Sequence, residues 1–206
     1  MPKIPYKIIF LISILSTVSS LKAQNMNLGF EVGAGQSKTD LYMEIGELLN
    51  YQNEDKIRLQ INSIIEYSPQ SAFFSVYSGI GYNQKGYEFS DFHYLSIPFV
   101  IRLNFGKTFK FYIGGGVYGS ILLKFKDKVV SENSKSYNHF DYGNILNAGL
   151  IFKVKDDIEI FIDYKNYIGR AIIYYYAGDY ENRNYSHYLN LGVSFAINKP
   201  FIKTCT

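Results

Sequence analysis

The sequence contains no tryptophan, five prolines and a single cysteine, and these scarcities narrow the possible classes of protein. Because Cys205 is the only cysteine, an internal disulfide is impossible. The N-terminal segment also lacks the cysteine that anchors a lipoprotein. No segment after residue 23 is apolar enough for a transmembrane helix, which needs about 20 apolar residues. If the chain is embedded in a membrane, it must therefore span it with strands.

The sequence also lacks a large excess of one charge. It holds 21 Lys and Arg against 18 Asp and Glu, and Lys3, Lys7 and Lys22 lie in the first 23 residues without any acid. The rest of the chain is therefore formally neutral. Since the basic balance belongs to the first segment, the sequence predicts no nucleic-acid partner.

The first 23 residues have the pattern of a secretory signal peptide. Lys3 and Lys7 precede an apolar run over residues 8–15, and the segment ends at Ala23. A short positive region, a short apolar region and a small residue at the cut are typical of such peptides. We expect a signal peptide over 1–23, one domain over 24–197 and a short periplasmic tail over 198–206. The alternative is an uncleaved N-terminal anchor.

Aromatic residues and glycines are abundant and fall into alternating patterns. The chain has 20 Tyr, 16 Phe and 17 Gly. Within residues 93–105, for example, Leu95 and Ile97 share one face and Ser96 and Pro98 the other, a period typical of half-buried strands. Eight segments with this alternation are predicted as strands: 27–36, 57–67, 73–84, 93–105, 109–123, 144–154, 158–167 and 188–197.

The connections between these segments alternate between short and long. The short ones cover residues 68–71, 106–107 and 155–157, and the long ones cover 37–56, 85–92, 124–143 and 168–187. Outer-membrane barrels have short periplasmic turns and longer external loops. The sequence therefore predicts an all-β fold, a closed eight-stranded antiparallel up-and-down transmembrane β-barrel. The helix-like spacing of residues 39–49 predicts a short amphipathic turn in the first long loop.

A polar face and aromatic ends accompany the strands. An eight-stranded barrel is just wide enough for side chains to fill its lumen, so charges there must pair. The predicted lumen charge network consists of Glu31, Arg58, Glu66, Arg102, Lys110, Glu159, Asp163 and Lys165. Interfacial aromatic belts are predicted at both ends. The belt at the short-turn end consists of Phe73, Phe105, Phe109, Phe152 and Phe195. The belt at the long-loop end consists of Tyr82, Tyr87, Phe89, Phe92, Tyr142, Tyr167, Tyr174, Tyr175, Tyr176, Tyr185 and Tyr188.

Several strands resemble a known family. The segment Tyr94-Leu95-Ser96-Ile97-Pro98-Phe99-Val100-Ile101-Arg102 is similar to a strand of the PorT-like outer-membrane β-barrel family of Bacteroidota. The glycine-rich segment 111–119, the segments 140–143 and 147–150, and residues 160–164 resemble further strands of that family. The resemblance implies an outer-membrane barrel with periplasmic termini. It implies no ligand and no activity.

The sequence offers little support for catalysis. His93, His139 and His187 fall near the long-loop ends and are interpreted as solvated or interfacial residues, the alternative being an external metal or acid–base site. His93 and Ser96 lie on opposite faces of a strand and form no catalytic dyad. No catalytic, metal or cofactor residue is predicted. A possible loop binding surface consists of Tyr174, Tyr175, Tyr176, Tyr180, Arg183 and Tyr185, although such tyrosines also suit a membrane belt.

Together these patterns predict a non-enzymatic protein of the cell outer membrane. Its expected partners are outer-membrane lipid, the barrel-insertion machinery and other envelope proteins or glycans. We expect a structural or interaction role through the external loops or the periplasmic rim, in adhesion, assembly or secretion support. Two alternatives are a narrow porin or transport component and a soluble exported β-barrel that binds a small apolar ligand.

Overall fold

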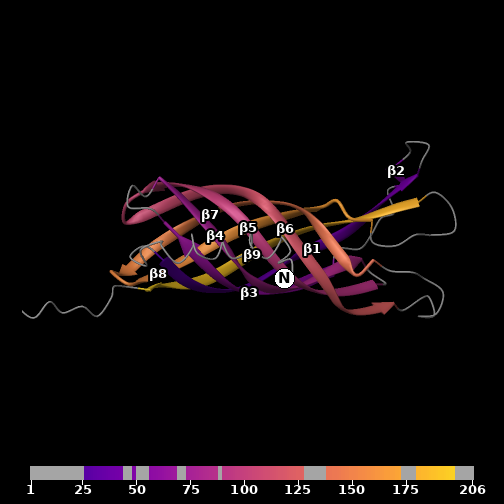
Figure 1. Ribbon diagram of the computed structural model, residues 1–206, viewed down its shortest axis with the longest axis horizontal. Coiled ribbons are helices and arrows are strands. Elements are labelled where there is room, and N and C mark those ends of the chain that lie inside the picture. Colours follow the sequence, from indigo (N-terminus) through magenta and orange to yellow (C-terminus); the bar gives the residue numbers. More distant parts are fainter. Residues whose placement is uncertain are drawn as a thin grey trace, which may run out of the picture.

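The computed structural model describes residues 26–43, 48–49, 56–68, 73–87, 90–127, 138–172 and 180–197, which form strands and their connections (Figure 1). The strands are β1 (Met26–Met43), β2 (Leu48–Leu49), β3 (Lys56–Tyr67), β4 (Phe74–Tyr87), β5 (Ser90–Gly106), β6 (Phe109–Asp127), β7 (Phe140–Lys155), β8 (Ile158–Gly169) and β9 (Tyr180–Ile197). In the described part of the chain, no helix is long and apolar enough to cross a membrane.

Eight of these strands form a closed wall. From β3 to β9 each strand pairs antiparallel with the next, β1 pairs with β3, and β1 also pairs with β9. The short strand β2 pairs only with β1, through Leu41 opposite Leu49 and Tyr42 opposite Leu48. The predicted closed, eight-stranded, up-and-down barrel is therefore confirmed, with β2 as an addition outside the wall.

The register fixes the stagger of the barrel. Following paired residues once around the wall leads from Leu28 to Ile65, Ser78, Phe99, Val117, Asn144, Ile168, Tyr185 and Lys38. The path returns to β1 ten residues further along the strand, as the numbers of Leu28 and Lys38 show. With a rise of about 3.3 Å per residue and a strand spacing of about 4.8 Å, this stagger corresponds to a tilt of about 40°.

Alternation along the strands separates an apolar outer face from a polar lumen. On β5, Ile97 and Phe99 are 57% and 53% exposed, whereas Arg102 is 2% exposed and Tyr94 is fully buried. The other strands repeat this pattern, because successive side chains of a strand point to opposite faces. A soluble barrel with an apolar ligand cavity would require the opposite orientation, so that alternative is excluded.

Two predictions about the connections are wrong. The expected long loop over 85–92 is largely strand, because β4 and β5 remain paired through Lys85 opposite Phe92 and Gly86 opposite Asp91. Gly86 adopts a φ of +120°, which a residue with a side chain rarely adopts, beside this tight connection. The expected amphipathic turn over 39–49 is replaced by the end of β1 and by β2. Residues 44–47 lie outside the described part of the chain.

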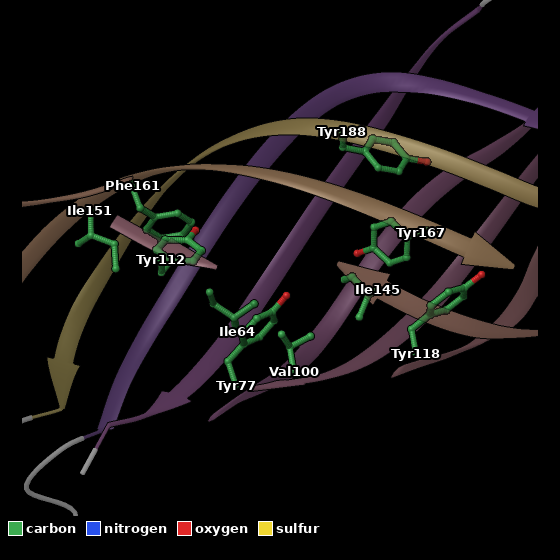
Figure 2. Close-up of a cluster of buried hydrophobic side chains, with 10 residues drawn as sticks. All are labelled: Ile64, Tyr77, Val100, Tyr112, Tyr118, Ile145, Ile151, Phe161, Tyr167 and Tyr188. Carbon is green, nitrogen blue, oxygen red and sulfur yellow. The ribbon is translucent and has the colours of Figure 1, made fainter. Parts of the chain in front are cut away.

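The aromatic belts were predicted correctly at one end only. Phe73, Phe105, Phe109, Phe152 and Phe195 are all exposed, and Phe73 and Phe105 pack edge to face at 5.6 Å between ring centroids. At the other end Tyr142 is exposed, but three residues predicted for the belt are buried in the lumen: Phe92, Tyr167 and Tyr188. Figure 2 shows Tyr167 and Tyr188 among the buried residues. Their position in the strand alternation, shared with Tyr94, Asp163 and Asn190, places them inside.

The predicted signal peptide over 1–23 and the tail over 198–206 both lie outside the described residues and stay predictions.

Candidate functional site

The centre of the lumen holds an arginine between two carboxylates and two aromatic rings. Arg102 Nη1 donates to Oε2 of Glu66 and Nη2 donates to Oδ2 of Asp163, both at 3.0 Å. The guanidinium carbon lies 4.1 Å from the ring centroid of Tyr77 and 4.3 Å from that of Tyr112. Planar stacking and a fixed fork of donors suit arginine to such a site. These contacts tie β5 to β3, β8, β4 and β6 across the lumen.

An ion pair between a lysine and a glutamate continues this group of charges towards β1. Lys165 on β8 forms an ion pair with Glu31 on β1, and its ammonium lies 3.6 Å from Oδ2 of Asp163. Asn62 also donates to Glu31. Lys165, Glu31 and Asp163 are each at most 3% exposed. The central charges therefore form one connected group that joins strands on opposite sides of the barrel.

A second buried ion pair lies towards the end where β4 and β5 connect. Lys85 donates to Oδ2 of Asp141 at 2.8 Å, and both side chains are at most 1% exposed. The Lys85 ammonium also lies 4.2 Å, 5.2 Å and 5.5 Å from the ring centroids of Tyr118, Tyr167 and Tyr94. Figure 2 shows Tyr118 on β6 and Tyr167 on β8, the strands on either side of β7, within the cluster of buried side chains. This tyrosine cage supports a cation away from bulk water.

Sequence reasoning missed the Lys85–Asp141 pair because both residues were assigned to long loops. The signal was present, since Tyr77, Gly81 and Lys85 keep the same parity along β4. Continuing the alternation past residue 84 would have placed Lys85 in the lumen.

Two further ion pairs lie nearer the ends of the lumen. Arg58 pairs with Asp91, and Lys56 donates to the same carboxylate at 3.3 Å. Towards the short-turn end Lys110 donates to Oε1 of Glu159 at 2.8 Å, in a pair that is partly exposed. All eight residues of the predicted lumen charge network thus take part in ion pairs of the lumen. The structure distributes them over three groups: Arg58 at one end, Lys110 with Glu159 at the other, and the remaining five at the centre.

The turn between β7 and β8 carries an exposed pair outside the lumen. Lys153 donates across the turn to Asp156, with 2.9 Å between nitrogen and oxygen. This hydrogen bond holds the pKa of Asp156 below its ordinary value. Exposed pairs of this kind contribute little to stability.

The histidines do not converge. His93 contacts the hydroxyl of Tyr82, and His187 lies 3.0 Å from the side-chain oxygen of Gln36. His139 is exposed beside the start of β7. Over the described ranges, no group of three His, Cys, Asp or Glu residues is placed to hold a metal ion.

The predicted loop binding surface is only partly described. Tyr174, Tyr175 and Tyr176 lie outside the described residues, and Tyr180 begins β9 without a described side chain. Arg183 and Tyr185 are half-buried on β9, where the Lys38 ammonium lies 5.7 Å from the Tyr185 ring centroid.

The family model described as "Outer membrane protein beta-barrel domain" matches residues 22–169, more than half of the chain. The chain belongs to the outer membrane protein β-barrel domain family. A comparison with curated proteins finds no match. For this family member, the apolar outer face is the surface that contacts outer-membrane lipid, and the protein is located in the outer membrane.

Three solved structures are among those similar to this chain. Neisserial surface protein A (NspA) is 12% identical, with 82% of this chain and 97% of that chain covered at a TM-score of 0.54. OprG from Pseudomonas aeruginosa is 12% identical, with coverages of 84% and 96% and a TM-score of 0.48. Ail of Yersinia pestis is 17% identical, with coverages of 84% and 99% and a TM-score of 0.45. At 12% identity the NspA likeness shows the fold alone, and it supports the closed barrel of the outer membrane β-barrel domain.

Proposed function

We propose that this outer-membrane barrel is a non-enzymatic interaction protein that acts through the strands rising above the outer leaflet. The observation that carries the proposal is a β-ribbon at one end of the barrel. The β1–β3 ladder ends at Ser37 opposite Lys56, but the β1–β9 ladder continues to Met43 opposite Tyr180. We call residues 39–43 of β1, residues 180–184 of β9 and strand β2 the external ribbon. Figure 1 shows the ends of β1 and β9 extending beyond the other strands, with β2 beside the end of β1.

Strand length supports a role outside the membrane. β1 and β9 have 18 residues each and β6 has 19. At a tilt of about 40°, 18 residues rise by about 45 Å, whereas the apolar band of an outer-membrane barrel is about 25 Å tall. The height of these strands along the barrel axis therefore exceeds that of the apolar band by about 20 Å. Three of the four connections at this end, over residues 44–55, 128–139 and 170–179, are long, and long connections are external in such barrels.

The filled lumen argues against the porin or transport alternative. Arg102 and Lys165 cross the centre with their carboxylate partners, and Lys85 with Asp141 crosses nearer the external end. A permeating solute would have to break these buried pairs, which is costly when a charge loses its partner. A role in adhesion, assembly or secretion support, with envelope proteins or glycans as partners, fits a closed barrel better.

A ribbon deletion tests the proposal. Residues 40–54 would be replaced by a four-residue Gly-Ser linker, which removes β2 and the end of β1 but keeps the β1–β3 ladder. Cells that display the wild type or this variant would be tested on arrays of immobilised glycans and matrix proteins. We expect both proteins to insert with the same heat-modifiable mobility and only the wild type to bind. Equal binding by both proteins, or steady ion conductance of the purified wild type in planar bilayers, would overturn the proposal.

A further inference from the structure

Among the buried side-chain oxygens without a hydrogen-bond partner in the described part of the chain, three carboxylate or amide oxygens lie on the neighbouring strands β3, β1 and β9. They are Oε2 of Glu31, Oε1 of Gln60 and Oδ1 of Asn190, and none has a hydrogen-bond partner among the described residues. Their side chains are 3%, 0% and 1% exposed. A buried acceptor without a donor costs about 1–3 kcal/mol. Three such acceptors on neighbouring strands therefore indicate a missing ligand.

The three side chains are neighbours on the lumen face around Gly33. In the register Gly33 lies directly between Gln60 on β3 and Asn190 on β9. Glu31 faces the lumen two residues earlier on β1. A Cβ atom on Gly33 would lie 1.9 Å from Oδ1 of Asn190, so only glycine leaves room for this oxygen. We call these three oxygens around Gly33 the lumen oxygen site.

The other end of each side chain fixes its orientation. The amide nitrogen of Gln60 donates to Oδ1 of Asn83 at 2.7 Å, and that of Asn190 donates to the backbone oxygen of Asp163 at 3.3 Å. The second carboxylate oxygen of Glu31, Oε1, accepts from the Lys165 ammonium. Rotating either amide would give up these hydrogen bonds. The site therefore presents acceptors only.

The surrounding charges lack one positive charge. The connected central group contains Arg102 and Lys165 as cations and Glu31, Glu66 and Asp163 as anions. Its formal net charge is one negative charge. An uncompensated charge in such a buried place is very costly, so a proton or a cation must balance it.

We propose that the lumen oxygen site binds one alkali-metal cation, Na⁺ or K⁺. A proton on a carboxylate would balance the charge but leave the oxygens of Gln60 and Asn190 without a partner. One water molecule has two hydrogens and would satisfy two of the three acceptors without balancing the charge. A cation answers both deficits, since carboxylate and amide oxygens are the ligands that hard cations take. Bound there, it joins β3, β1 and β9 beside the closing ladder of the barrel.

Cation-dependent stability tests this site. The full chain would be refolded into detergent micelles at constant ionic strength, with NaCl or KCl exchanged for N-methylglucamine chloride, and its unfolding midpoint followed by heat-modifiable mobility. Above the dissociation constant of the cation, a tenfold rise in its free concentration is expected to raise the unfolding midpoint by about 3–5 °C. Gln60→Met removes one ligand and is expected to abolish most of this shift.

A control and a second variant keep the test decisive. Asn104 also has a side-chain oxygen without a partner among the described residues, but it lies at the short-turn end beside Ser75. Asn104→Leu is therefore expected to keep the cation dependence. If Gln60→Met does not fold, Gln60→Glu adds a negative ligand and is expected to enlarge the shift. An equal midpoint in all three salts, a midpoint that changes with pH but not with the cation, or an unchanged shift in both Gln60 variants overturns the proposal.

Discussion

Replacing Arg102 by methionine removes the charge at the centre of the lumen while keeping a long side chain in its place. The guanidinium donates at 3.0 Å to both Glu66 and Asp163, and it stacks between the rings of Tyr77 and Tyr112. Removing one partner of a buried ion pair costs about 3–5 kcal/mol, because the other charge stays buried. The lost ring contacts add about 1 kcal/mol. We therefore expect Arg102→Met to lower the free energy of unfolding by about 4–6 kcal/mol.

Urea unfolding in detergent micelles measures this change. Because the chain has no tryptophan, the transition is followed by circular dichroism rather than by tryptophan fluorescence. Asp163→Asn removes a partner charge, so the double variant with Arg102→Met is expected to lose at least 2 kcal/mol less than the sum of the single variants. Lys110→Met is the matched control. Its pair with Glu159 is partly exposed, and we expect a loss of at most about 1 kcal/mol. The reasoning is refuted if Arg102→Met stays within 1 kcal/mol of the wild type, or if the two losses simply add.

The remaining predictions address the Lys85–Asp141 ion pair, the lipid-facing surface and one buried aromatic side chain. Lys85→Met leaves Asp141 buried without its cation and is expected to cost about 3–5 kcal/mol, measured by the same urea titration. Ile101→Arg on the lipid face is expected to cost about 2–4 kcal/mol in bilayers, whereas Val154→Arg near the turn costs about 0–1 kcal/mol; equal losses would contradict the orientation of the band. Phe92→Ala opens a cavity and is expected to lower the free energy of unfolding by about 3–5 kcal/mol. Because the ion pairs of the lumen remain, planar-bilayer recordings of this variant are expected to show no conductance.

Much of the fold could be predicted because period-2 patterns report directly which face a residue occupies. Ile97 and Phe99 point outward and Arg102 inward as the alternation requires. The predictions failed where the alternation was stopped too early or where aromatic character was given more weight than the alternation. Ending the strand at residue 84 placed Lys85 in a loop, and aromatic character led to Phe92 being placed at the interface.

The partners within the lumen could not be predicted, because they depend on the stagger of the wall. Arg102 on β5 contacts Asp163 on β8 only because each strand is displaced along its neighbours by a fixed amount. No local pattern reports that displacement. Composition therefore indicated that the charges in the lumen balance. The partners themselves, Lys165 with Glu31 and Lys85 with Asp141, could be identified only from the closed barrel.

The ladder between β1 and β9 also has a consequence for the order of assembly. It joins the first and last strands along their whole length, from Met26 opposite Ile197 to Met43 opposite Tyr180. Until the last strand arrives, both edges of the sheet expose unpaired backbone groups, which favours pairing with other chains. Contacts so distant in sequence also form slowly. Pairing of β1 with β9 is therefore the contact that removes both edges at once and turns an open sheet into a cylinder without edges.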